Sequence, residues 1–160
     1  MYDDNFYMQQ ALEQAALAYT ADEVPIGAII VNTSGEIVAR AYNKVEKSQT
    51  QTAHAEMLAL AQAGNAFGDW RLEGYTIYVT LEPCSMCMSA ILMSRLAVVV
   101  FAVPSKLFGF SRDSCITMDM ERCSIIIKEG ACRDEAVALL QSFFKRKREE
   151  NRERKKTGNE

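Results

Sequence analysis

The stretch "YTIYVTLEPCSMC", residues Tyr75–Cys87, decides the fold. Its first part, Tyr75–Leu81, is rich in β-branched and aromatic residues and therefore predicts a buried strand. Pro83 lies two residues further, and proline suits the first position of a helix because no backbone N–H is needed there. We expect that helix to run to about Arg95. A strand that leads straight into a helix is typical of α/β proteins.

The rest of the chain continues this alternation of strands and helices. A long loop or short helix without a clear period is expected over Ser105–Glu121. The pattern predicts one α/β domain over residues 1–156, with a five-stranded mixed sheet flanked by helices as three layers, and a frayed end at 157–160. Further helices are expected at Asp3–Tyr19, Thr52–Ala63 (capped by Thr52 and ended near Gly64) and Arg133–Arg154, and further strands at Ile26–Val31, Glu36–Asn43, Ala97–Val103 and Cys123–Lys128.

Composition narrows the class of protein. A chain of 160 residues with 49% hydrophobic and 24% charged residues is typical of a soluble globular domain. No apolar run is long enough for a membrane helix, and the acidic start "MYDDNFYMQQ" differs from a signal peptide, so we expect a cytoplasmic protein. An odd count of 5 cysteines favours free thiols or metal ligands over a disulfide framework.

Positive charge gathers near the end of the chain. The segment "KRKREENRERKK", residues 145–156, holds eight Lys or Arg and three Glu, whereas the whole chain carries −3. A basic segment on an acidic body often contacts a polyanion. The plainer interpretation is a solvated helix whose charges pair along its own surface.

Two short motifs offer metal ligands. "TAHAEMLAL", residues 52–60, holds the single histidine, His54, followed by Glu56, and "EPCSMC" holds Cys84 and Cys87. Both motifs are expected to open helices that pack on the same side of the sheet. Two thiolates and one imidazole suit tetrahedral zinc, and three protein ligands leave one position open, as in catalytic sites. The spacing H-x-E…P-C-x-x-C is the signature of zinc deaminases that act on nucleobases, with the glutamate as proton shuttle.

Other functions would use the same residues differently. A structural zinc module would need a fourth protein ligand, for which Cys115, Cys123 and Cys132 are available. A redox protein could use the CxxC pair alone, but His54 and Glu56 would then have no role. A deaminase of free bases or nucleosides, such as guanine or cytosine, would use the same zinc site but would gain little from a basic helix.

The sequence resembles the bacterial tRNA adenosine deaminases of the cytidine deaminase-like superfamily. The matching text is "DEVPIGAIIV", "YNKVEKS", "TAHAEMLAL", "YVTLEPCSMC" and "EAVALLQSFFKRKRE", and the similarity covers about Phe6 to Arg148. The resemblance implies a homodimer with one zinc ion per chain that converts the wobble adenosine of a tRNA anticodon loop to inosine and releases ammonia.

The resemblance also implies roles for particular residues. His54, Cys84 and Cys87 would hold the zinc, and Glu56 would move protons. Around the flipped nucleotide the resemblance places Asn43, Ile26 and the N–H of Ala55, and beside the anticodon loop it places Phe143, Phe144, Lys145 and Arg146.

Two segments depart from the family pattern: Thr50 and Gln51 occupy the places where the family usually has Asp-Pro, and the loop after the fourth strand differs as well. Where these enzymes commonly have small Gly and Ala residues after the fourth strand, this chain has "KLFGFSRDS", residues Lys106–Ser114. Phe108, Phe110 and Arg112 are much bulkier, so we expect this loop either to stack on RNA bases or to alter the choice of substrate.

Overall fold

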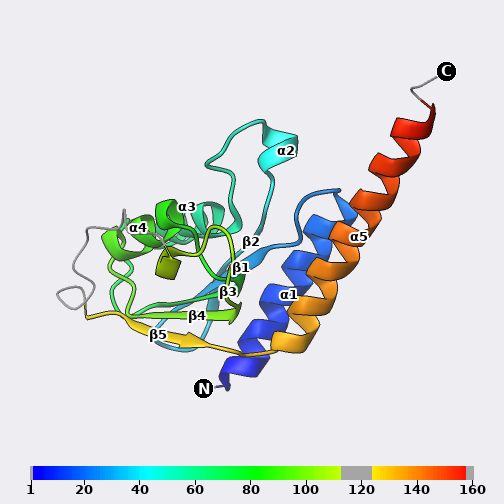
Figure 1. Cartoon of the computed structure of the whole chain (residues 1–160). Helices are drawn as coiled ribbons and strands as arrows, with labels where there is room; N and C mark the ends of the chain where they lie inside the picture. Colours follow the sequence, from blue (N-terminus) through cyan, green and yellow to red (C-terminus); the bar gives the residue numbers. More distant parts are fainter. Residues whose placement is uncertain (1, 113–123, 158–160) are drawn as a thin grey trace.

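The computed structural model describes residues 2–112 and 124–157 and contains a mixed sheet of five strands in the order β2-β1-β3-β4-β5. β1 is antiparallel to β2 and β3, whereas β3, β4 and β5 are mutually parallel neighbours. The predicted five-stranded mixed sheet is therefore confirmed (Figure 1). The elements are α1 (Asp4–Thr20), β1 (Gly27–Val31), β2 (Ile37–Tyr42), α2 (Val45–Ser48), α3 (Ala55–Phe67), β3 (Thr76–Leu81), α4 (Ser85–Met93), β4 (Val98–Val103), the 3₁₀ turn η1 (Phe110–Arg112), β5 (Ile126–Glu129) and α5 (Arg133–Thr157).

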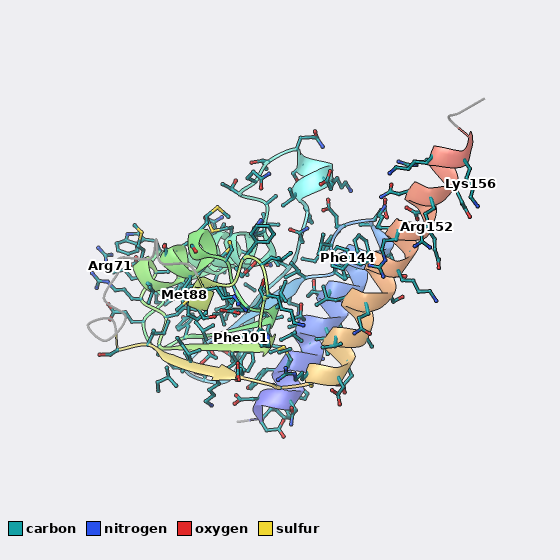
Figure 2. The ribbon with its side chains drawn as sticks, in the orientation of Figure 1. Arg71, Met88, Phe101, Phe144, Arg152 and Lys156 are labelled. Carbon is teal, nitrogen blue, oxygen red and sulfur yellow. The ribbon has the colours of Figure 1, made fainter. Side chains whose placement is uncertain are left out.

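Helices cover both faces of the sheet, which gives the three expected layers. Side chains alternate along β1, so that Ile30 packs with α3 and α4 while Ile29 packs with α1. Met88 and Phe101 belong to the core between the sheet and the α3–α4 layer (Figure 2). α1 and α5 lie side by side on the opposite face, and α5 extends beyond the body of the molecule (Figure 1).

Gly27 lets α1 approach the sheet closely. A Cβ atom at this position would lie 2.1 Å from the carbonyl oxygen of Ala11 and 2.4 Å from the nitrogen of Ala15. These are backbone atoms that cannot move aside without shifting the helix. Only glycine therefore fits at the start of β1, next to Ile26.

Two helix boundaries differ from those expected. α3 begins at Ala55 with His54 as its N-cap residue, so Thr52 does not cap it. The helix continues through Gly64 and ends at Gly68, whose φ of 78° is the left-handed conformation that glycine favours. α4 begins at Ser85 with Cys84 as its N-cap, so Pro83 precedes the helix instead of opening it.

Two further segments also differ from expectation. α2 was not anticipated because four residues carry too little periodicity to detect. The fifth strand begins at Ile126. Its predicted start at Cys123 lies outside the described residues, and so do residues 113–121 of the expected loop. Within the described part of the chain, no helix combines the length and apolar character that membrane spanning requires.

Candidate active site

Two helix N-termini meet at the candidate site. His54 precedes α3 with φ −67° and ψ 150°, and Cys84 precedes α4 with φ −74° and ψ 170°, so both have the extended backbone of an N-cap residue. Neither side chain makes a capping hydrogen bond to its own helix. Both side chains are therefore free to turn toward each other, where the partial positive charge of the helix ends favours anionic groups.

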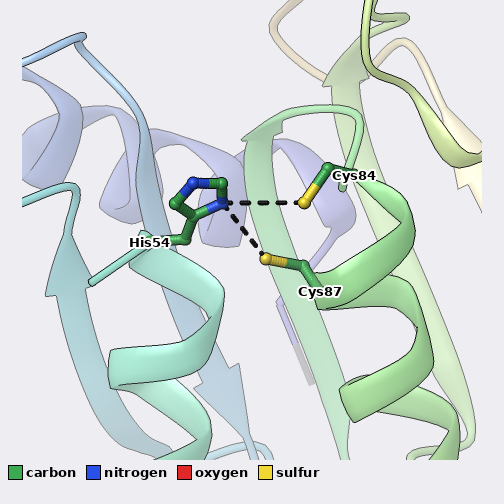
Figure 3. Close-up of side chains that lie close together, drawn as sticks. All are labelled: His54, Cys84 and Cys87. Atoms are coloured by element: carbon green, nitrogen blue, oxygen red, sulfur yellow. Dashed lines mark hydrogen bonds between the residues drawn. The ribbon is translucent and has the colours of Figure 1, made fainter. Parts of the chain in front are cut away.

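His54, Cys84 and Cys87 form a group that fits a zinc ion. Nδ1 of His54 lies 3.6 Å from Sγ of Cys84 and 3.4 Å from Sγ of Cys87 (Figure 3). Zinc bonds of about 2.0 Å to nitrogen and 2.3 Å to sulfur in a tetrahedron would separate these atoms by about 3.5 Å. The donor set and its spacing therefore match zinc without rearrangement. Among the residues that the structure describes, this is the one group of three candidate ligands, all within 4.8 Å.

The ionisation of the three groups is coupled. A hydrogen bond from Cys87, together with contact to His54, lowers the pKa of Cys84 to about 4. The same hydrogen bond and burial raise the pKa of Cys87, because both favour its neutral thiol over the thiolate. The hydrogen bond to Cys84 raises the pKa of His54. A dication between the sulfurs would stabilise both thiolates at once.

Glu56 lies in the first turn of α3 and is 4% exposed. Burial raises the pKa of Glu56 to about 6, although the neighbouring His54 opposes the shift. A carboxylate near this value accepts and returns protons readily around neutral pH.

His54, Cys84 and Glu56 line one cavity of about 410 Å³, within the range of small-ligand pockets. Ile26, for which a substrate contact was predicted, lies in its wall, and Ala55 is buried at the start of α3 beside the ligand His54. Sequence reasoning assigned no role to several other residues of the wall. Those residues are Gln51, Leu81, Glu82, Met86 and Ser105. Phe108, whose loop the sequence predicted either to stack on RNA bases or to alter the choice of substrate, also lies in the wall.

Asn43 lies at the end of β2, beside Ile26, which lines the cavity. Its backbone N–H donates to the carbonyl of Ile26 at 2.9 Å, and its side-chain amide donates to Glu23 at 3.2 Å. Glu23 is 1% exposed and also accepts the backbone N–H groups of Glu46 and Lys47. Since the amide nitrogen donates to Glu23, the side-chain oxygen of Asn43 is the atom that can accept a further hydrogen bond.

The four predicted residues of α5 lie in the layer opposite α3 and α4. Phe143 is 4% exposed and packs edge-to-face on Tyr19, which holds α5 on α1; its predicted place beside the anticodon loop stays a prediction. Phe144 is 45% exposed and Lys145 is exposed. Arg146 pairs with Asp22 at 2.9 Å and lies over the ring of Tyr19.

Paired helix N-termini that present His, Glu and two Cys on a mixed sheet define the class of zinc-dependent deaminases. Residues 1–103 match the family described as the cytidine and deoxycytidylate deaminase zinc-binding region. The chain belongs to this family, and it is accordingly a zinc-dependent hydrolase.

Individual proteins of the family resemble the chain over most of its length. A tRNA-specific adenosine deaminase of Bacillus subtilis is 40% identical over 98% of both chains. A solved structure from work on A-to-I editing by tRNA:A34 deaminases at the wobble position of transfer RNA is 33% identical, with a TM-score of 0.74 over 84% of this chain and 99% of that one. A guanine deaminase of Nitrosomonas europaea is 26% identical, with a TM-score of 0.79 over 89% of this chain and 85% of that one.

Replacing Cys87 with Ala should remove the zinc. Two remaining ligands bind the ion far more weakly than three, so elemental analysis of the purified variant should find almost none, against about one zinc per chain in the parent. Cys132→Ala is the matched control, because Cys132 contacts Asn5 and Gln9 in the α1–α5 layer. Full zinc content in Cys87→Ala would contradict this set of ligands.

Proposed function

We propose that the chain hydrolyses adenosine to inosine at the wobble position of a tRNA anticodon and releases ammonia. The observation that carries this proposal is the identity of 40% to a tRNA-specific adenosine deaminase, which extends over 98% of both chains. It therefore includes the basic C-terminal helix as well as the zinc motifs. A tRNA substrate would place the enzyme in the cytoplasm.

The zinc site supplies the nucleophile. His54, Cys84 and Cys87 would hold the ion, and their donor atoms already have the spacing that zinc needs. When bound, zinc lowers the pKa of water and so provides a nucleophile near neutral pH. Replacement of the amino group at C6 of adenine by this oxygen gives inosine, with one water consumed and one ammonia released.

Glu56 moves the protons that this substitution requires. It takes one proton from the attacking water and gives it to N1 of the ring, then takes the second proton from the new hydroxyl at C6 and gives it to the departing amine. Its carboxylate lines the cavity with His54 and Cys84, so it can reach both the nucleophile and the base. Because its pKa is raised to about 6, Glu56 can both accept and release a proton near neutral pH.

The other walls of the cavity would hold the base. Ile26 and Leu81 line the cavity, are apolar and suit the face of a purine. Asn43 lies beside Ile26, and its side-chain oxygen would suit a donor on the nucleotide. The base must leave its stack to enter the cavity. That costs least in a single-stranded loop, where bases are poorly stacked.

The outer half of α5 offers a surface for RNA phosphates. Arg152 and Lys156 lie on the part of α5 that extends beyond the body of the molecule, as Figure 2 shows. Asp22 binds Arg146 and Lys147, which fixes the inner half of the helix on the loop that leads to Ile26. The helix is thus anchored near the cavity and its exposed cations point outward, where a stem-loop could lie.

A deaminase of free bases is the second candidate. The observation that favours it is the guanine deaminase of Nitrosomonas europaea, which has the higher TM-score, 0.79 against 0.74, although the lower identity. Such an enzyme would use the same zinc ligands and Glu56. The structural zinc module would need a fourth protein ligand. Cys132 lies across the sheet from the site, beside Asn5 of α1, and cannot serve as that ligand. Cys115 and Cys123 lie outside the described residues.

Substrate tests separate these functions. The zinc-loaded protein should form inosine and ammonia from an anticodon stem-loop with a wobble adenosine, and little ammonia from free adenosine, cytidine, cytosine or guanine. Ammonia from guanine or cytosine alone would support the second candidate.

Glu56→Ala should keep the zinc and lose at least about a hundredfold in rate, since general acid–base catalysis is worth about 10²–10⁴-fold. Wild-type turnover by Glu56→Ala would contradict the proton-shuttle role.

Removing exposed charge from the outer half of α5 should weaken RNA binding. For the double variant Arg148→Gln, Arg152→Gln we expect a slope of log K against log salt that is smaller by about 1–2, since each lost phosphate contact releases about 0.7–0.9 fewer counterions. The matched control is Arg40→Gln, Arg133→Gln, which removes the same charge from β2 and from the start of α5. Equal salt slopes in the two variants would indicate that α5 is only a solvated helix.

We propose a homodimer formed through the outer surface of α3 and α4. Trp70, Phe67 and Met93 are 55–66% exposed there, around a groove of about 760 Å³. Arg71 and Arg95 lie over the ring of Trp70. Tryptophan and arginine are the residues most often found at the centre of protein interfaces, and an exposed apolar patch indicates a partner. A second copy of the chain is the partner that the resemblance implies.

Met93→Glu should convert the dimer to a monomer, because it places a charge in this apolar surface. Sedimentation at micromolar protein should show about half the parent's mass. Leu17→Glu is the control, since Leu17 is similarly exposed at 48% but lies on α1 in the opposite layer. An unchanged mass for Met93→Glu would remove this surface from consideration.

A further inference from the structure

Phe108 stands where two cavities meet. The catalytic cavity, about 410 Å³, adjoins a second one of about 430 Å³, and Cys84, Met86 and Phe108 line both. Phe108 comes from the loop after β4 and is 75% exposed, so its ring is accessible to solvent where it lines both spaces. The second cavity, called here the adjoining groove, is also lined by Ser85, Leu107, Gly109 and Arg112.

The loop that carries Phe108 is fixed by a buried carboxylate. Glu82 is 4% exposed, and its two oxygens accept the backbone N–H groups of Ser105 at 2.8 Å and Ser111 at 3.0 Å. A Cβ atom at Gly109 would lie 2.2 Å from the same carboxylate, so only glycine allows this close approach. The backbone around Phe108 is thus tied to the strand end that leads to Cys84.

A second tie comes from the residues on either side of the ring. The N–H of Phe110 donates to the carbonyl of Pro83 at 2.9 Å, and Gly109 forms an isolated bridge with Cys84. Phe110 itself is buried edge-to-face on Phe101. The exposed ring of Phe108 therefore does not belong to the core, and the loop holds it in place at the edge of the catalytic cavity.

We propose that Phe108 is a specificity-determining residue, which separates the target base from the next nucleotide of the RNA and stacks on that neighbour in the adjoining groove. This proposal rests on the proposed function. Aromatic rings provide stacking surfaces for single-stranded bases, and Arg112 provides a cation for the phosphate between the two nucleotides. A free base fills only the catalytic cavity and makes no use of the groove. Phe108 thus favours a polynucleotide substrate.

Phe108→Ala tests this directly. We expect KM for the anticodon stem-loop to rise on the order of 10-fold, with a smaller change in kcat and with zinc content still about one per chain. Phe108→Trp should keep the parent KM because a larger ring still stacks. Phe6→Ala is the matched control, since Phe6 is an exposed aromatic residue of α1 in the opposite layer.

A binding measurement that needs no turnover completes the test. In a trinucleotide, 2-aminopurine placed next to the target adenosine should lose fluorescence on the parent, through stacking, and lose much less on Phe108→Ala. Glu82→Gln should resemble Phe108→Ala, because one of the two N–H groups would face an amide nitrogen that cannot accept it.

The two assays distinguish the two proposals. Equal KM and equal quenching for the parent and Phe108→Ala, with RNA deaminated by both, would overturn the role of Phe108 and leave the proposed function intact. Quenching that depends on Phe108, with no RNA deaminated by either protein, would support the adjoining groove and overturn the proposed function.

Discussion

The structure depends on two helices, α3 and α4, whose N-cap side chains lie at the zinc site and do not cap the helix. An N-cap side chain that bonds its own helix contributes about 1 kcal/mol, and α3 and α4 both do without it because His54 and Cys84 turn toward a shared point. A zinc ion there would stabilise both helix starts at once, because it holds a residue of each. It would also join two segments that lie thirty residues apart in the chain (Figure 3).

Much of the fold and the centre of the site could be predicted because their signals are local. Continuous apolar runs mark β1, β3 and β4, and the residue types at His54, Glu56, Cys84 and Cys87 are those that zinc chemistry needs. The ends of the helices were harder to predict from the sequence. Gly64 and Gly68 are both adequate stop signals, and the tertiary position of α3 decides between them.

The rest of the site depends on contacts between distant segments, for which the sequence has no local sign. Phe143 and Phe144 are adjacent and identical in type, yet the packing of α5 on α1 buries one and exposes the other. Glu23 and Glu82 resemble ordinary acidic residues in the sequence, but each is buried. Glu23 binds backbone N–H groups of α2, and Glu82 binds those of the loop after β4. These two carboxylates thus take no part in the reaction, but their hydrogen bonds fix the backbone around the cavity that contains the zinc site.

The tight contact of α1 with Gly27 means that α1, on the opposite face of the sheet, fixes the position of one wall of the cavity. Ile26 is the residue just before this contact, and it cannot move inward or outward unless α1 moves with it. Cavity width is therefore a property of helix-to-sheet distance as much as of the wall residues themselves. Directed evolution of substrate size in this scaffold should accordingly select changes along the buried face of α1, at Ala11 or Ala15, which no substrate touches.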